Sequence, residues 1–212
     1  ELQLGGLGVV LNFEDTATDW LGGPAAGAAD AVFAAGQARF LGYPAGSVIP
    51  GSADFDMTDA QWLSACRGYA VAYRDGLHAA GYRAGVYGAW DTLSRCQQLG
   101  GFDLFWQSMS TAFSGGRNAT AWPGAHLRQL RQTTVGGLSV DYNEIRRSDW
   151  QGTAVALRDD NDFLALIERI DHFMRAQTSN PNDPSGKPYP IQIVSDIEAI
   201  KTQAAANGAG LT

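Results

Sequence analysis

Residues 47–56 read Ser-Val-Ile-Pro-Gly-Ser-Ala-Asp-Phe-Asp, a short apolar run that ends in two carboxylates. An apolar run without polar alternation is typical of a strand buried on both faces, as in a parallel sheet. Thr58 and Gln61 follow with the spacing of a capping box, which predicts a helix that continues to about residue 80. This stretch therefore predicts a strand, an acidic strand end and a helix in immediate succession.

The same unit recurs on both sides of this stretch. Apolar runs at 7–13, 82–89 and 104–108 predict further buried strands. Between them, Pro24 opens an alanine-rich helix that extends to about Phe40, and residues 91–99 predict a short helix. Alternation of strands and helices at this spacing implies parallel strands joined by helical crossovers.

Two short strands, 127–130 and 138–142, are predicted next, with little room for helices between them. The predicted fold class is α/β, with an irregular TIM-like β/α barrel favoured over an open doubly wound sheet. A complete barrel has eight strands, more than the sequence predicts. We therefore expect the first strand of the barrel to be missing from this chain.

The character of the sequence changes after Gly152. Apolar residues recur at helical spacing over 160–177, four prolines fall between Pro181 and Pro190, and a second amphipathic helix is predicted over about 195–206. These features predict two domains: residues 1–152 form the barrel, and residues 153–212 form a helical connector with an extended, proline-rich tail.

Candidate site residues were sought at the carboxyl ends of the predicted strands, because functional side chains of β/α barrels lie there. Those ends carry acids, amides and aromatic rings, and paired carboxylates with aromatic platforms suit carbohydrate chemistry. Each acid also has a plainer interpretation, as part of a helix cap, a solvated loop or a turn. The candidates are Glu14, Asp54, Asp56 and Asp141 for catalysis, and Tyr87, Trp106, Gln107 and Gln129 for substrate binding.

Composition excludes several other classes of function. The formal net charge of −7 over 212 residues argues against a nucleic-acid partner. No window reaches the roughly 20 apolar residues of a membrane span. The three histidines have no ligand spacing and no nucleotide-binding loop is present, so we expect neither a metal nor a cofactor. Cys66 and Cys96 are expected to be two buried thiols.

Several short motifs occur in an order that resembles a known family, the glycoside hydrolase-like domain of unknown function 1906, or Rv2525c-like family. The resemblance covers about residues 5–152. The motifs include Asn12-Phe13-Glu14, Ala53-Asp54-Phe55-Asp56, Gly85-Val86-Tyr87-Gly88, Trp106-Gln107, Leu127-Arg128-Gln129 and Gly136-Gly137-Leu138-Ser139-Val140-Asp141-Tyr142. The family occurs in actinobacterial secreted proteins and in phage lysins and tail proteins, and its fold is similar to that of family 25 lysozymes.

The resemblance implies lysozyme-type cleavage of peptidoglycan glycan strands. The Asp-x-Glu of the lysozymes matches Asp54 and Asp56, which implies Asp56 as the general acid and Asp54 as a base or electrostatic stabiliser. A late lysozyme motif matches Val140-Asp141-Tyr142-Asn143, which adds Asp141. The lysozymes also use an Asp on their first barrel strand, which has no counterpart in the predicted strands.

The sequence is consistent with two functions. The first is a peptidoglycan-directed glycoside hydrolase, carried by a phage lysin or tail protein or by a secreted actinobacterial protein. The second is a non-catalytic cell-wall glycan-binding or structural module of a phage tail, in which residues 153–212 contact other tail subunits. Both imply an extracellular or virion-associated location.

Overall fold

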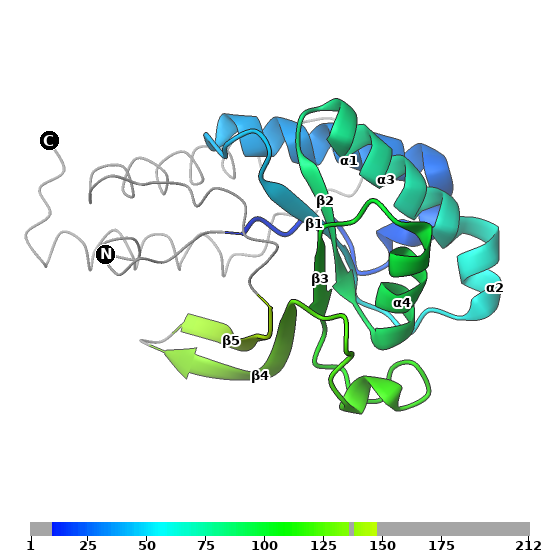
Figure 1. Ribbon diagram of the computed structural model, residues 1–212, viewed down its shortest axis with the longest axis vertical. Helices are drawn as coiled ribbons and strands as arrows, with labels where there is room; N and C mark the ends of the chain where they lie inside the picture. Colours follow the sequence, from blue (N-terminus) through cyan, green and yellow to red (C-terminus); the bar gives the residue numbers. More distant parts are fainter. Residues whose placement is uncertain (1–9, 136–137, 148–212) are drawn as a thin grey trace, which may run out of the picture. The chain divides into compact units, whose positions relative to one another are not determined.

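The computed structural model describes residues 10–135 and 138–147, which belong to one compact unit, Val9–Ala154. The unit is built on a five-stranded sheet whose strands lie side by side in chain order (Figure 1). The first four strands are parallel and the fifth is antiparallel to the fourth. The strands are β1 (Val48–Ala53), β2 (Arg83–Gly88), β3 (Leu104–Gln107), β4 (Leu127–Val135) and β5 (Leu138–Ile145).

Strands β1 to β3 confirm the apolar runs that predicted them. All of β1 is buried, and so is β2 from Ala84 onward, as expected for strands covered on both faces. Phe13 extends the sheet beyond β1: it pairs in parallel with Gly51, and its backbone nitrogen donates to the carbonyl of Pro50 at 2.8 Å. The strand predicted over 7–13 is thus a single bridge at Phe13 in the described part of the chain.

The helices lie close to their predicted bounds. They are α1 (Gly23–Phe40), α2 (Asp59–Gln61), α3 (Arg67–Ala79) and α4 (Trp90–Leu99), with a π-helical turn η2 (Trp62–Cys66) between α2 and α3 and 3-10 turns η1 (Asp19–Gly22) and η3 (Arg117–Ala119). The predicted capping box is present, because Thr58 Oγ1 accepts from Gln61 N at 3.2 Å and Gln61 Oε1 accepts from Thr58 N at 2.9 Å. The long helix predicted to follow is divided by η2.

Small residues let α1 and α3 pack closely against each other (Figure 1). Ala31, Ala35 and Ala38 of α1 are fully buried, and a Cβ atom on Gly27 would lie 2.4 Å from the carbonyl oxygen of Tyr69 on α3. The hydroxyl of Tyr69 crosses the contact and donates to Asp30 at 2.6 Å. The alanine-rich sequence of α1 is therefore a packing requirement.

The end of the described chain differs from the prediction. Residues 127–135 and 138–145 form two longer strands, paired as an antiparallel hairpin that Figure 1 shows on the opposite side of the molecule from α1 and α3. Within residues 10–135 and 138–147, no pairing joins β5 to the Phe13 edge of the sheet. The structure thus confirms a mixed α/β fold with a mostly parallel sheet, and the described residues do not form a closed barrel.

The remaining predictions concern the two cysteines, membrane-spanning helices and residues 153–212. Cys66 and Cys96 are free and buried, as expected. In the described ranges, the helices are too short or too polar to cross a membrane. The helices predicted over 160–177 and 195–206 and the proline-rich stretch between them lie outside the described residues.

Candidate functional site

A pocket of about 330 Å³ lies where the parallel strands end. Because the carboxyl ends of parallel strands meet at one edge of a sheet, side chains from consecutive strands converge there. The segment around Phe13, the strands β1 to β5 and the loop after β3 all contribute to its lining. The lining residues are Asn12, Glu14, Asp54, Tyr87, Trp106, Met109, Ser110, Gln129, Gln132 and Asp141.

Asp54, the first residue after β1, is the least exposed acid of the pocket. Its Oδ1 atom is shielded from solvent, and neither carboxylate oxygen accepts a hydrogen bond from the described residues. Burial raises the pKa of the Asp54 carboxyl above its ordinary value, and the negative charge of Asp141 raises it further. Asp54 is therefore an acid whose protonated form is favoured by its surroundings.

Tyr87 and Gln129 form a fixed polar pair beside Asp54. The Tyr87 hydroxyl donates to Gln129 Oε1 at 2.7 Å, and the backbone nitrogen of Met109 donates to the same oxygen at 3.2 Å. Burial raises the pKa of the Tyr87 phenol, and the charges of Asp54, Glu14 and Asp141 raise it further, so this hydroxyl keeps its proton. With its oxygen engaged, Gln129 has its amide NH₂ group left to donate to a ligand.

Trp106 supplies the aromatic surface of the pocket. Its ring meets that of Tyr87 edge to face, with 5.5 Å between the centroids. The indole nitrogen donates to Asn143 Oδ1 on β5 at 2.8 Å, which fixes the orientation of the ring. A held, partly exposed indole plane is a suitable surface for the apolar face of a sugar ring.

Asp56 and Gln107 lie outside the lining of this pocket, although both were predicted as site residues. Asp56 Oδ1 accepts a hydrogen bond from the backbone nitrogen of Ser114 at 2.8 Å. The Gln107 side chain is fully buried; it donates to Asn118 Oδ1 at 2.9 Å and accepts from Trp122 N at 2.8 Å. Both side chains hold the loop that follows β3, the loop that brings Met109 and Ser110 to the pocket.

Four lining residues were not predicted: Asn12, Met109, Ser110 and Gln132. Asn12 could have been found, because it lies two residues before Glu14 and on the same face of an extended segment. Gln132 could not be found by strict alternation from Gln129, since the register of β4 shifts between Gln129 and Arg131. This β-bulge places Gln129 and Gln132 on the pocket side, while the Arg131 guanidinium lies over the Tyr142 ring at 4.8 Å.

The lining contains three carboxylates and lacks arginine, lysine and histidine. Among the described residues, no group of three His, Cys, Asp or Glu side chains is arranged so that it could hold a metal ion. An uncharged ligand rich in hydroxyl groups matches the carboxylate and amide oxygens, and an anionic ligand would be repelled.

A mostly parallel sheet with carboxylates and aromatic rings gathered at its strand ends resembles the active-site end of β/α glycoside hydrolases. The chain belongs to the Rv2525c-like, glycoside hydrolase-like domain family, whose model matches residues 2–160. This confirms the resemblance that the ordered motifs indicated.

Solved structures agree with this family. The chain is similar to the Mycobacterium tuberculosis Tat-secreted protein Rv2525c in complex with L-tartrate, with 26% identity, a TM-score of 0.60, and coverage of 71% of this chain and 74% of that one. A second crystal form of the same protein, in complex with HEPES, matches with 26% identity, a TM-score of 0.59 and the same coverage. A comparison with curated protein sequences finds no match.

Proposed function

We propose that this domain binds a glycan in the pocket at the strand ends and hydrolyses a glycosidic bond there, with Asp54 as the general acid. The observation that carries the proposal is the state of Asp54: a partly buried carboxyl that accepts no hydrogen bond from the described residues, beside two further carboxylates. A glycosidase needs one carboxylic acid that stays protonated and one that is ionised, and unequal environments provide the pair.

The other carboxylates have complementary roles in this proposal. Glu14 and Asp141 are exposed at the pocket, and one of them acts as the base or nucleophile. Trp106 stacks on a sugar ring, and the Gln129 and Gln132 amides bind hydroxyl groups. This division of roles differs from the one implied by the lysozyme resemblance, because the Asp56 carboxylate is engaged by the loop after β3.

Peptidoglycan glycan is the substrate that we propose. The support is the resemblance to family 25 lysozymes together with a pocket that suits uncharged sugar units. We further propose that the protein acts outside the cytoplasm, since the similar mycobacterial protein is described as Tat-secreted.

The test measures new reducing ends released from purified actinobacterial peptidoglycan by the 212-residue chain. Asp54→Asn is expected to lower release about 10²- to 10⁴-fold, the usual contribution of a general acid, while binding to the same peptidoglycan is retained. Asp103→Asn is the matched control, because Asp103 precedes β3 at the opposite end of the sheet, and full release is expected from it.

Three other outcomes contradict parts of this proposal. Loss of release in Asp56→Asn with activity retained in Asp54→Asn would assign the acid to Asp56. Binding of peptidoglycan without any release by the wild-type chain would leave a glycan-binding module. Neither binding nor release would remove peptidoglycan as the substrate.

A further inference from the structure

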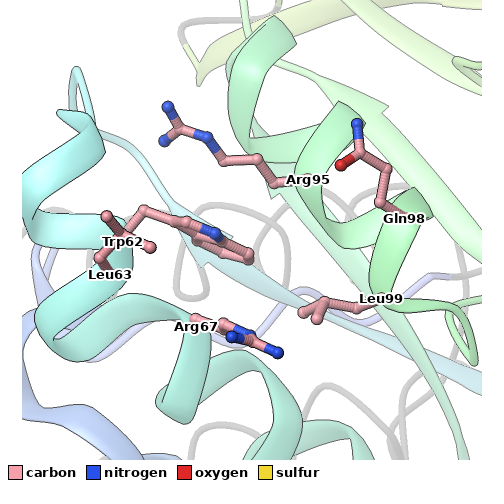
Figure 2. Close-up of a pocket in the computed structure, with 6 residues that line it drawn as sticks. All are labelled: Trp62, Leu63, Arg67, Arg95, Gln98 and Leu99. Carbon is pink, nitrogen blue, oxygen red and sulfur yellow. The ribbon is translucent and has the colours of Figure 1, made fainter.

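A second cavity, of about 270 Å³, lies away from the strand ends, between helix α4 and the segment formed by η2 and the start of α3 (Figure 2). It shares no residue with the pocket described above. Its lining combines two arginines with an indole and two leucines. The lining residues are Trp62, Leu63, Arg67, Arg95, Gln98 and Leu99.

Arg95 gives this cavity a partly desolvated positive charge. Its side chain is 17% exposed, and its guanidinium lies over the Trp62 ring at 5.7 Å. Nη2 pairs with Asp59, a carboxylate that is 90% exposed, while Nη1 is shielded from solvent and has no hydrogen-bond partner among the described residues. A solvated carboxylate neutralises a neighbouring charge weakly, so Arg95 retains positive potential.

Arg67 adds a second positive charge to the same cavity. Its side chain is exposed and makes no ion pair or hydrogen bond with the described residues. In Figure 2 the Trp62 indole lies between the side chains of Arg67 and Arg95. Two guanidinium groups thus line a cavity whose lining contains no carboxylate, on a chain with a net charge of −7. An anion in this cavity would be attracted by both positive charges.

The rest of the lining selects among anions. Leu63 is 74% exposed, and with Trp62 and Leu99 it offers an apolar surface beside the guanidinium groups. Guanidinium binds a planar carboxylate through two parallel hydrogen bonds. An apolar group attached to that carboxylate would add hydrophobic binding energy by covering the indole and the leucines. A small organic acid satisfies both features, whereas inorganic phosphate satisfies the charge alone.

We propose that the cavity between η2, α3 and α4 is a second ligand site, which binds a carboxylate attached to a small apolar group. Arg67 holds the carboxylate, Arg95 adds positive potential on the other side of the Trp62 ring, and Trp62, Leu63 and Leu99 contact the apolar group. The carboxylate belongs either to a free organic acid or to an acidic side chain of a peptide. The site is independent of the glycan pocket and does not require the domain to be an enzyme.

The test is a titration of the ¹⁵N-labelled 212-residue chain with 3-phenylpropionate, followed by NMR through the indole N–H of Trp62, assigned with Trp62→Phe. We expect a saturable shift with the acid and none with its uncharged amide. Arg67→Gln is expected to weaken binding about tenfold, as for the loss of one charge-assisted hydrogen bond, and Arg67→Lys to restore part of it. Because the Arg67 side chain is exposed and makes no ion pair or hydrogen bond with the described residues, both Arg67 variants are expected to fold normally.

Arg39→Gln is the matched control, since it removes one positive charge from an exposed position in the last turn of α1. Its affinity for 3-phenylpropionate is expected to equal that of the wild type. An amidated peptide that carries one phenylalanine and one aspartate distinguishes the two sources. If the peptide binds more tightly than 3-phenylpropionate, the site exists and its natural ligand is an acidic side chain of a protein partner. If 3-phenylpropionate binds more tightly, the site exists and its natural ligand is a free organic acid.

Four results would overturn the proposal: no saturable shift with either carboxylate probe, an equal shift with the amide, equal weakening in Arg39→Gln and Arg67→Gln, or tighter binding of inorganic phosphate than of 3-phenylpropionate. None of these measurements uses glycan cleavage. Failure of this proposal and failure of the proposed function are therefore distinguishable.

Discussion

The pocket is defined at the scale of single residues by the contrast between Asp54 and Asp56, two acids separated by one position. Asp56 accepts a backbone hydrogen bond and serves the loop after β3. Asp54 has no such partner in the part of the chain that the structure describes, and it lines the pocket. Of the two, only Asp54 lines the pocket, where a ligand can reach its carboxyl.

The titration of Asp54 is expected to respond to Asp141. Because the negative charge of Asp141 raises the pKa of the Asp54 carboxyl, Asp141→Asn should move the Asp54 titration to lower pH. The measurement follows the side-chain carboxyl ¹³C resonance of Asp54 against pH. Asp103→Asn, which removes a distant charge, should leave the curve in place, and an unchanged curve in Asp141→Asn would contradict the assigned coupling.

Asp54 also makes the folded state less stable at neutral pH. Its pKa is raised in the folded protein, so the unfolded chain ionises more readily, and stability is lost as the pH rises above about 3.9, the ordinary value for Asp, through the raised folded value. Asp54→Asn is expected to raise Tm at pH 7 and to have little effect near pH 3, where both states are protonated. Thermal unfolding at the two pH values checks this, and an equal Tm at pH 7 would rule it out.

At the scale of elements, the contact between α1 and α3 depends on the absence of a side chain at Gly27. A Cβ atom there would lie 2.4 Å from a backbone oxygen of Tyr69, which cannot move without moving α3. Gly27→Ala is therefore expected to cost about 1–3 kcal/mol of unfolding free energy, as overpacking does.

Gly36 is the matched control for this prediction, because it lies on the same helix and its Cβ would meet nothing within 4 Å. Gly36→Ala is expected to stabilise the domain by up to about 1 kcal/mol through helix propensity. Both values come from denaturant unfolding followed by far-UV circular dichroism. Equal effects of the two substitutions would show that propensity, and not the contact with Tyr69, decides the outcome.

At the scale of the whole molecule, the sequence predicted the parallel part of the sheet well and the hairpin poorly. Runs such as 47–55 and 82–89 are apolar because their strands are covered on both faces, and that pattern is local. The hairpin exposes Leu130, Tyr142 and Ile145 and carries many polar residues. Backbone pairing with a partner strand determines its length and direction, and no single segment encodes that pairing.

The sequence predicted part of the candidate site, as it did part of the sheet. Glu14, Asp54 and Asp141 converge because they follow or lie on strands of one sheet, which is a consequence of topology alone. The separation of Asp56 and Gln107 from the pocket depends on the path of the loop after β3. A β-bulge decides which side of β4 faces the pocket. Long loops and bulges leave little trace in the pattern of apolar residues.

The hairpin of β4 and β5 can change in length without disturbing the rest of the sheet. It contributes Gln129, Gln132 and Asp141 to the pocket, yet β5 pairs only with β4 among the described strands. Residues can be added in pairs at its tip without altering the register of β1 to β3, because only the strands of the hairpin are lengthened. A longer or shorter hairpin would therefore reshape one wall of the pocket, while Glu14 and Asp54 keep their positions on the other side of the sheet edge.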